Sequence, residues 1–460
     1  MLPRLLATVL LVAGFAAAQD WPRFRGPNGS GVSDTSGLPS EFGPSKNLRW
    51  KTAVPFSRSS PVIAGDRIYL TAAEGDQLIT LCLDRSSGRV RWRRQITRPR
   101  VMPIYKLNDP ASPTPVTDGR NVYAFFAEMG LVSFTSDGVE RWRLPLGPFD
   151  TFYGVSTSPI LSGATLLMLC DTRSKGFLIA VDSASGRVRW RVERSLTRME
   201  GYSTPVIYTP AGEPAQVIVL GGKRLDAYAV ATGERIWWLR GLGHLPVATP
   251  VFTKNAVVVT TYGSDALEGP AFEEFLKSDA NGDGRLAREE MKDFDEFGHI
   301  DTNSDGFIDR QEWDFLRNAG LGEYGLLAVP LGGRGEFTSK AILWREKKSY
   351  ALVPSSLLYQ DVLYVIKSGG IITSLDSATG RQFKTDRAKD ALGEYYASPV
   401  AADGKVVFVS EAGKVVVVKA GPQWEVLAVN DLGEESYATP AITAGQLFIR
   451  TRNALYCFGK

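Results

Sequence analysis

The stretch Ala180-Val-Asp-Ser-Ala-Ser-Gly-Arg-Val-Arg-Trp190 decides the fold, because close copies of it recur along the chain. It predicts a strand, a tight turn at Ser-Gly and a second strand that ends in tryptophan. Counterparts occupy residues 83–92, 136–142, 230–238 and 375–383. Repetition at a period of about 45 residues is typical of a unit of four short strands.

A second repeated phrase gives the number of units. A Ser/Thr-Pro pair precedes a short apolar strand seven times, and Ser355-Ser356 is an eighth copy in which serine replaces proline. The prolines of these pairs are Pro61, Pro115, Pro159, Pro205, Pro250, Pro399 and Pro440. Only the step from Pro250 to Ser356 is abnormal. It is about 60 residues longer than the others, so it contains an insert.

The tryptophan phrase also counts to eight, but only if the chain closes on itself. Its outer-strand aromatic residues are Trp50, Trp92, Trp142, Trp190, Trp238, Trp344, Phe383 and Trp424. The last unit, residues 439–460, ends before such a strand, whereas residues 48–51 precede the first Ser-Pro pair. We therefore predict an all-β, eight-bladed β-propeller in which the N-terminal strand completes the last blade. Closure leaves no radial edge unpaired.

This repeat resembles the tryptophan-docking repeat of quinoprotein alcohol dehydrogenases and their pyrroloquinoline-quinone-like (PQQ-like) propeller relatives. The resemblance implies that each outer-strand tryptophan packs on the turn of a neighbouring blade. For the dehydrogenases it also implies PQQ as cofactor, held by an adjacent Cys-Cys pair, a stacking tryptophan and an acidic calcium cluster. This sequence has no neighbouring cysteine pair, so its residues give PQQ no specific support.

Bulk properties and the N-terminus indicate where the protein works. A net charge of +3 over 460 residues predicts no strong attraction to nucleic acid or anionic membranes. Residues 1–18 have the charged start, apolar core and small residues of a secretory signal, and the apolar run is too short for a membrane span. We expect a lead-in segment at 19–44, the propeller at 45–460, and a periplasmic or secreted monomer.

Cysteine and histidine usage narrows the chemistry. Cys82, Cys170 and Cys457 are odd in number and widely spaced, which predicts buried apolar side chains rather than disulfides. The only histidines are His244 and His299. That number argues against a histidine-based zinc site or a Ser-His relay.

The insert, residues 264–323 in blade five, is acidic and helical and contains two calcium-loop motifs. Both match Asp-x-Asn-x-Asp-Gly-x-[Leu/Ile]-x-x-x-Glu, the EF-hand loop, whose spacing gathers the oxygens that Ca²⁺ requires. The predicted ligands of loop 1 are Asp279, Asn281, Asp283, the carbonyl of Arg285, and Glu290. Those of loop 2 are Asp301, Asn303, Asp305, the carbonyl of Phe307, Asp309 and Glu312.

Four further expectations follow from these two loops. Leu286 and Ile308 should pair between the loops, and one helix from Glu289 to about Phe297 should serve both. Because loop 2 has acidic residues at more ligand positions than loop 1, we expect it to bind more tightly. The compact spacing favours a stabilising role over sensing.

A candidate binding site lies at one mouth of the central channel. Three units carry a Glu-x-Tyr phrase just before the innermost strand, formed by Glu200 and Tyr202, Glu394 and Tyr396, and Glu435 and Tyr437. These residues could hold an unidentified protein or small-molecule ligand. Packing of the tyrosines between blades, with solvated glutamates, is the alternative.

The sequence favours a secreted or periplasmic calcium-binding propeller that acts as a binding or assembly scaffold, and it indicates no catalytic residue. One alternative is a PQQ-dependent dehydrogenase, a quinone-dependent oxidoreductase. Another resembles the outer-membrane protein assembly lipoprotein, although no lipid-anchor cysteine follows the expected cleavage site.

Overall fold

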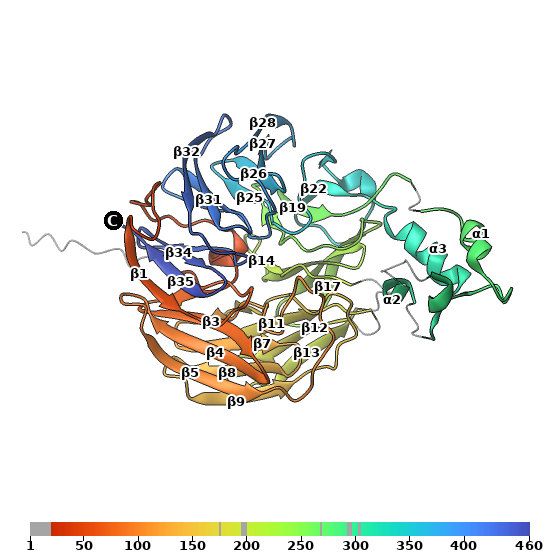
Figure 1. Ribbon diagram of the computed structural model, residues 1–460, viewed down its shortest axis with the longest axis horizontal. Helices are drawn as coiled ribbons and strands as arrows, with labels where there is room; N and C mark the ends of the chain where they lie inside the picture. Colours follow the sequence, from red (N-terminus) through yellow and green to blue (C-terminus); the bar gives the residue numbers. More distant parts are fainter. Residues whose placement is uncertain (1–19, 174–175, 195–199, 267–268, 292–296, 302–304) are drawn as a thin grey trace, which may run out of the picture.

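The computed structural model describes residues 20–173, 176–194, 200–266, 269–291, 297–301 and 305–460. Eight antiparallel sheets are arranged around a central axis, and a small helical insert lies to one side (Figure 1). The predicted eight-bladed propeller with an insert in blade five is therefore confirmed. The predicted signal, residues 1–18, lies outside the described residues.

In each of the first four blades the chain runs from an innermost to an outermost strand. Blade 1 contains β2 (Val62–Ala64), β3 (Arg67–Glu74), β4 (Gln77–Asp84) and β5 (Val90–Thr97). Blade 2 contains β6 (Val116–Thr117), β7 (Asn121–Phe126), β8 (Gly130–Thr135) and β9 (Glu140–Pro145). Blade 3 contains β10 (Ile160–Ser162), β11 (Thr165–Cys170), β12 (Phe177–Asp182) and β13 (Val188–Glu193). Blade 4 contains β14 (Val206–Tyr208), β15 (Gln216–Gly221), β16 (Arg224–Ala229) and β17 (Arg235–Arg240).

The remaining blades follow the same order, apart from the insert and the closing strand. Blade 5 contains β18 (Val251–Phe252), β19 (Ala256–Thr261), β22 (Gly325–Pro330) and β24 (Trp344–Glu346), with β23 (Gly335–Phe337) and η4 (Ser339–Ala341) between the last two. Blade 6 contains β25 (Leu357–Tyr359), β26 (Val362–Lys367), β27 (Ile371–Asp376) and β28 (Gln382–Arg387). Blade 7 contains β29 (Val400–Ala402), β30 (Lys405–Val409), β31 (Lys414–Lys419) and β32 (Glu425–Asp431). Blade 8 contains β33 (Ala441–Thr443), β34 (Gln446–Arg450), β35 (Ala454–Phe458) and, from the other end of the sequence, β1 (Leu48–Ala53).

The N-terminal strand closes the ring, as predicted. β1 pairs antiparallel with β35, and the register places Trp50 opposite Cys457 and Ala53 opposite Ala454. Arg450 strengthens the same seam. Its guanidinium donates at 2.8–2.9 Å to the backbone carbonyls of Pro55, Ser59 and Thr71 beside blade 1.

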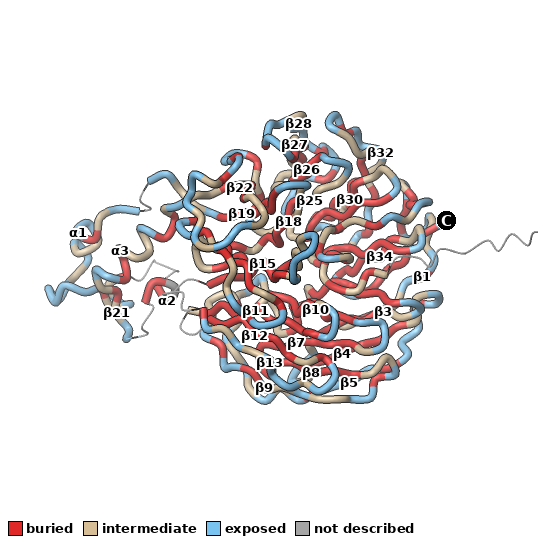
Figure 2. The backbone as a smooth tube through the Cα atoms, turned by 180° about the vertical axis from the view of Figure 1, so that it is seen from behind, coloured by how far each residue is buried: buried red, intermediate tan, exposed pale blue. Residues whose placement is uncertain are grey.

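The middle strands of the blades form the core, and the outer strands face solvent. Every residue of β11 and β19 is buried, whereas β13 alternates between exposed and half-buried residues. Figure 2 shows this gradient from buried inner chain to exposed rim. Continuous β-branched runs are needed because stacked blades cover both faces of each sheet. All three cysteines are free and buried in this core.

Tryptophan docking joins neighbouring blades. The indole Nε1 groups of four tryptophans donate to turn carbonyls of the next blade, from Trp50 to Arg85 (2.9 Å), Trp92 to Ser136 (2.8 Å), Trp142 to Ser183 (3.1 Å) and Trp190 to Val230 (3.0 Å). Each ring lies against the glycine of that turn. Gly88, for example, has φ +70°, and a Cβ added there would lie 2.4 Å from Trp50.

Blade 4 departs from the docking pattern. The position equivalent to the docking tryptophans is occupied by Trp237 rather than by the predicted Trp238. Trp237 is fully buried, and its indole donates to Gln216 within its own blade at 3.2 Å. It stacks on Phe337 of β23 with ring centroids 5.3 Å apart. β23 pairs in parallel with β17, so it adds a fifth strand to blade 4 that the repeat did not predict.

The lead-in segment packs onto the ring. Trp21 is fully buried and exchanges two backbone hydrogen bonds with Ile63, and Val32 forms a parallel bridge with Ala401. The segment also contains η1 (Pro27–Gly29). Because Ile63 and Ala401 belong to innermost strands of blades 1 and 7, the lead-in segment crosses one end of the central channel.

Two buried arginines hold this crossing in place. Arg23 donates to the carbonyl of Pro205 at 2.7 Å, and Arg25 donates to the carbonyl of Ser356 at 2.8 Å. Burial lowers the pKa of both guanidinium groups to about 9. Their carbonyl partners lie just after the Ser/Thr positions of blades 4 and 6, so the arginines tie the lead-in segment to two separate blades of the ring.

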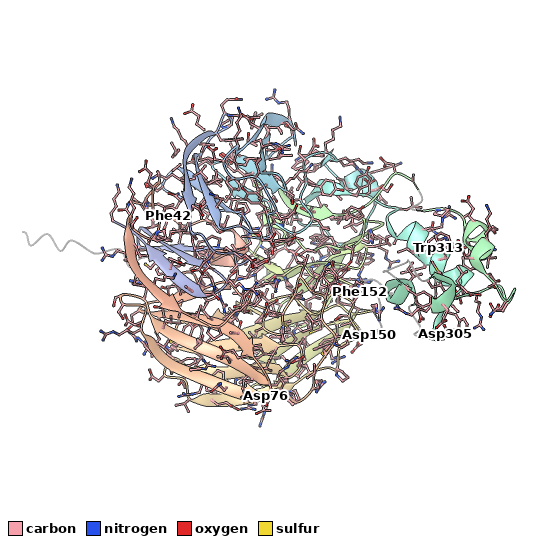
Figure 3. The ribbon with its side chains drawn as sticks, in the orientation of Figure 1. Phe42, Asp76, Asp150, Phe152, Asp305 and Trp313 are labelled. Carbon is pink, nitrogen blue, oxygen red and sulfur yellow. The ribbon has the colours of Figure 1, made fainter. Side chains whose placement is uncertain are left out.

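The insert has its own small core. It consists of α1 (Phe272–Phe275), η2 (Leu276–Ser278), β20 (Leu286–Ala287), η3 (Arg288–Met291), α2 (Phe297–Ile300), β21 (Phe307–Ile308) and α3 (Arg310–Ala319). Leu286 pairs with Ile308 across β20 and β21, as expected. The predicted single helix from Glu289 to Phe297 spans residues 292–296, which lie outside the described residues. Figure 3 labels Asp305 and Trp313 in this insert, away from the ring.

None of the helices in the described part of the chain has the length and apolar character needed to cross a membrane.

Packing of a tryptophan against the turn of the next blade can be tested with two glycines in blade 3. Gly186 and Gly163 both have positive φ, but an added Cβ would lie 2.6 Å from Trp142 at Gly186 and would meet nothing within 4 Å at Gly163. We expect G163A to lose about 1–2 kcal/mol of unfolding free energy from backbone strain. G186A should lose about 2–4 kcal/mol, because crowding of the indole adds to that strain. Urea denaturation measures both, and equal losses would contradict tryptophan docking.

Candidate functional site

The Ser/Thr residues of the repeated phrase form a ring of hydrogen bonds around the channel. In each link a backbone N–H donates to the hydroxyl of the next blade. The links run from Ser60 to Thr114 (3.0 Å), Thr114 to Ser158 (3.0 Å), Ser158 to Thr204 (3.1 Å), Thr249 to Ser355 (2.9 Å), Ser355 to Ser398 (3.0 Å), Ser398 to Thr439 (3.0 Å) and Thr439 to Ser60 (3.1 Å). Among the described residues, the Thr249 hydroxyl has no hydrogen-bond partner, so the ring is interrupted between blades 4 and 5.

A cavity of about 450 Å³ lies at this hydroxyl ring. Phe24 of the lead-in segment is part of its lining, together with most of the Ser/Thr hydroxyl positions. The aromatic wall consists of Tyr105, Tyr153, Tyr202, Tyr396 and Tyr437. Tyr202, Tyr396 and Tyr437 precede the Ser/Thr positions in the chain, whereas the carbonyls that bind Arg23 and Arg25 follow them. The lead-in segment and these three tyrosines therefore lie on opposite sides of the ring.

The three predicted tyrosines line the cavity, and their glutamates lie behind them. Tyr396 and Tyr437 stack with centroids 5.8 Å apart. Tyr202 contacts Tyr153 edge-on at 5.7 Å. The three tyrosines thus line one cavity in two separate groups.

None of the three glutamates is part of the cavity lining. Glu200 is buried and accepts the Tyr202 hydroxyl and the Phe152 backbone N–H, and burial raises the pKa of its carboxyl. Glu435 pairs with Arg452 at 2.8 Å. Glu394 accepts the Ser368 hydroxyl. Glu200 and Glu435 accept hydrogen bonds from wall tyrosines, whereas the Glu394 partner Ser368 lies outside the lining.

Sequence reasoning missed Arg58, Tyr105 and Tyr153. Tyr105 and Tyr153 come from connections between blades. Arg58 lies three residues before Pro61, the position that Tyr202, Tyr396 and Tyr437 occupy in their own phrases. The interval between Pro61 and Pro115 is the longest of the ordinary steps, and this extra length was the available signal for Tyr105.

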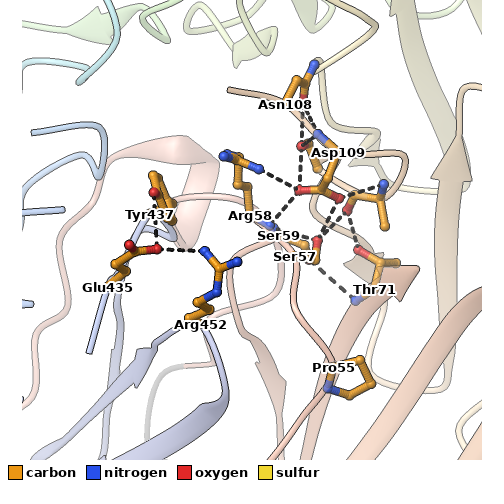
Figure 4. Close-up of polar contacts among 12 residues, drawn as sticks. Pro55, Ser57, Arg58, Ser59, Thr71, Asn108, Asp109, Glu435, Tyr437 and Arg452 are labelled. Carbon is orange, nitrogen blue, oxygen red and sulfur yellow. Dashed lines mark hydrogen bonds and ion pairs between the residues drawn. The ribbon is translucent and has the colours of Figure 1, made fainter. Parts of the chain in front are cut away.

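Arg58 supplies the charge of the cavity. Its guanidinium lies over the Tyr437 ring, 4.5 Å from the ring centroid, and is 3.7 Å from the Asp109 carboxylate. A dashed line in Figure 4 marks the contact between Arg58 and Asp109. Asp109 accepts the backbone N–H groups of Arg58 and Ala111, both at 2.8 Å. The hydroxyls of Ser57 and Ser112 also lie within hydrogen-bond distance of it, although each has a second acceptor. The carboxylate is therefore satisfied mainly by groups other than the guanidinium.

The cavity lining does not fit PQQ as the dehydrogenase resemblance implies. Its described residues include no cysteine, no tryptophan and no carboxylate. Cys82, Cys170 and Cys457 are buried in the strands of three separate blades. The cofactor-holding groups expected from the resemblance are thus absent from the described lining.

Loop 1 of the insert wraps around its first and last carboxylates. Asp279 accepts the backbone N–H groups of Gly282 and Gly284 at 2.8 and 2.9 Å. Glu290 accepts those of Ala280 and Ala287 at 2.8 and 2.7 Å. The turn needs Gly284, whose φ is +77°. Asn281 and Asp283 lie within the same loop and accept from nearby backbone N–H groups.

Loop 2 has the same plan and a more buried donor set. Asp301 accepts the backbone N–H groups of Asp305 and Gly306 at 3.1 and 3.0 Å. The exposed fraction is 8% for Asp301 and 1% for Glu312. Asp309 caps α3 by accepting the Glu312 N–H at 2.8 Å. Asn303 lies outside the described residues.

The donor chemistry of the loops fits calcium. Carboxylate and amide oxygens are the ligands of this hard cation, and buried carboxylates such as Asp301 and Glu312 are stabilised by a positive partner. Arg285 and Phe307 offer backbone carbonyls, while the Arg285 guanidinium lies over the Phe307 ring at 4.1 Å. Over the described residues, no three His, Cys, Asp or Glu side chains are gathered closely enough to hold a metal ion.

Comparison with known proteins identifies relatives of both parts. A family model described as outer membrane protein assembly factor BamB matches residues 43–164, 135–259 and 336–460. An EF-hand model matches residues 294–316, which include loop 2.

Curated relatives match over part of their length. The assembly factor BamB of Burkholderia pseudomallei is 26% identical over 228 residues, 48% of this chain and 55% of that protein. That of Francisella salina is 24% identical over 166 residues, 35% of this chain and 30% of that protein. The chain thus matches between about a third and about half of the length of these relatives.

Solved structures share the fold. BamB from Moraxella catarrhalis aligns with a TM-score of 0.52 and 14% identity, over 89% of this chain and 98% of that one. A europium-containing methanol dehydrogenase aligns with a TM-score of 0.59 and 9% identity, over 96% and 98%. The quinohemoprotein alcohol dehydrogenase ADHIIG of Pseudomonas putida gives 0.59 and 10%, over 96% and 80%.

At these identities the structural likeness shows the fold alone. The three family matches, however, cover most of the ring on both sides of the insert and well over half of the chain. The chain therefore belongs to the PQQ-like repeat propeller family described as outer membrane protein assembly factor BamB, and it carries an inserted EF-hand region.

Proposed function

We propose that this protein acts in the periplasm or outside the cell as a calcium-binding β-propeller that serves as a binding or assembly scaffold. The family match over 43–164, 135–259 and 336–460 carries the proposal, because the proteins it describes are assembly factors. The ring supports this role physically. A closed propeller holds the connections of eight blades in fixed relative positions, and such connections are where binding residues concentrate.

The proposal assigns Ca²⁺ to both loops of the insert. In loop 1 the ligands are Asp279, Asn281, Asp283, the Arg285 carbonyl and Glu290. In loop 2 they are Asp301, Asn303, Asp305, the Phe307 carbonyl, Asp309 and Glu312. Bound calcium would neutralise these acidic loops and hold the ends of the short helices together.

The attachment of α3 supports a stabilising role for calcium. Lys223 of blade 4 donates to the carbonyls of Asn318 and Leu321, at the C-terminal end of the helix, at 2.9 and 2.8 Å. Loop 2 leads into the other end of the same helix through Asp309. An ion in loop 2 would therefore fix the free end of a helix whose other end already lies on the ring.

Substitution of Asp309 tests the calcium assignment. Loop 1 has alanine, Ala287, at the corresponding position, so D309A gives loop 2 the loop 1 residue there. Loss of one acidic group should weaken calcium binding at loop 2 by about tenfold, or ~1.4 kcal/mol. Calorimetric titration of the full chain should show one weakened site and one unchanged site.

The variant D309S controls for helix capping. Serine retains an oxygen that can accept the Glu312 N–H, whereas alanine does not, and loss of a cap costs about 1 kcal/mol of stability. Both variants should weaken binding if charge is the cause. Wild-type affinity in D309A would contradict the assignment of loop 2 as the tighter site.

Deletion of the gene in its own bacterium tests the scaffold role. We expect the level of folded outer-membrane proteins to fall and to return when the wild-type chain is supplied. The heat-dependent gel mobility of outer-membrane β-barrel proteins measures this level. Unchanged assembly, together with dye-linked alcohol oxidation after the purified chain is given PQQ and calcium, would favour the dehydrogenase alternative instead.

A further inference from the structure

The channel-mouth cavity combines an apolar wall with one charged side chain. Leu245, Val247 and Leu352 line it beside the tyrosines, and Arg58 is the one charged residue among its described lining. Its volume of about 450 Å³ lies within the range of about 300–1,000 Å³ that is typical of small-molecule sites. An occupant must therefore be mostly apolar and of small-molecule size.

The Arg58 guanidinium is positioned to receive an anion. Its side chain is 16% exposed, and it forms no hydrogen bond with any residue in the described part of the chain. The Asp109 carboxylate is 3.7 Å away, beyond hydrogen-bond distance, and each of its oxygens accepts a backbone N–H at 2.8 Å. Arg58 thus keeps its N–H groups available, while the Tyr437 ring supports its flat face at 4.5 Å.

Arg452 shows the contrasting arrangement a short distance away. Both arginines lie over the Phe56 ring at 5.2 Å. Arg452, however, donates to Glu435 at 2.8 Å and is not part of the cavity lining (Figure 4). Both guanidinium groups therefore contact the Phe56 ring, but only that of Arg452 is hydrogen-bonded to a carboxylate of the protein.

Tyr437 is held so that its ring forms part of the wall. Its hydroxyl donates to Glu411 at 2.7 Å, outside the lining residues, and its ring stacks on Tyr396. Burial raises the pKa of the Tyr437 hydroxyl, so the phenol stays neutral at physiological pH. This part of the wall therefore adds aromatic surface beside Arg58 without adding charge.

We propose that this cavity binds a small amphipathic monocarboxylate, with its apolar body against the tyrosines and aliphatic side chains and its carboxylate on Arg58. A single cation matches a single anionic group, because a second buried charge would be left without a partner. The described lining contains no residue of the calcium loops, and the proposal does not rest on the scaffold role, so the two proposals can fail separately.

Calorimetric titration of the full chain with 4-phenylbutyrate tests the proposal, with 4-phenylbutan-1-ol as the uncharged probe of the same shape. We expect one site per chain for the acid and at least about tenfold weaker binding of the alcohol. R58Q should weaken binding of the acid by about tenfold or more, because a charge-assisted hydrogen bond is lost. R452Q should bind like the wild type.

Two further variants keep the test decisive if R58Q folds poorly. R58K retains the charge and should bind the acid more tightly than it binds the alcohol. V247W fills the cavity from the aliphatic side and should abolish binding of both probes while circular dichroism stays unchanged. Equal affinities for acid and alcohol, equal affinities of R58Q and R452Q, or no saturable binding at millimolar probe would each overturn the proposal.

Discussion

The antiparallel pairing of β1 with β35 is the constraint on which the rest of the structure depends. Without it, blade 8 would lack its outer strand, and the first and last units would each present an unpaired face. Trp50 connects both sides of this seam, because it pairs with Cys457 in blade 8 while its indole docks on Gly88 of blade 1. Arg450 adds hydrogen bonds from blade 8 to carbonyls near blade 1. Closure thus combines strand pairing, aromatic packing and buried polar contacts at one place. A propeller depends on these contacts because a single blade buries too little apolar surface to be stable on its own.

Closure also determines the shape of the cavity. Once eight innermost strands surround one axis, each Ser/Thr of the repeated phrase lies next to its counterpart in the following blade. Seven of the eight links form, from Ser60 around to Thr439 and back. Backbone N–H groups that would otherwise point unpaired toward the channel are satisfied in this way. The lead-in segment then covers one end through Arg23 and Arg25, so the tyrosine-lined side is left as a blind cavity.

The sequence predicts the structural features that recur from blade to blade, and it predicts less well the features that occur in only one blade. The number of blades, the closing strand and the Leu286–Ile308 pair follow from periodic signals, and the structure has all three. The positions of Tyr202, Tyr396 and Tyr437 follow from a threefold phrase. Arg58 occupies the same position before its Ser-Pro pair, but its residue type differs from that of the three tyrosines, so the phrase does not reveal it. Tyr105 and Tyr153 lie outside the phrase, so their convergence depends on how the connections between blades fold. Trp237 follows Gly233 by four residues, as Trp92 follows Gly88, so the spacing of the repeat indicates Trp237 rather than Trp238. What the repeat does not predict is β23, which supplies its stacking partner Phe337.

The backbone segment that anchors the insert to the ring also leads to the wall of the cavity. The chain leaves α3 and reaches Glu323, which exchanges backbone hydrogen bonds with Gly241 and Gly243 beside blade 4. His244 then bridges to Tyr262, at the start of the insert. The next residue, Leu245, has φ +46° and lines the cavity. Only a few residues therefore separate the backbone that anchors the insert from the aliphatic wall of the cavity. Because a residue with positive φ is held in place by its surroundings rather than by its own preference, the anchoring of the insert and the shape of that wall share the same local contacts.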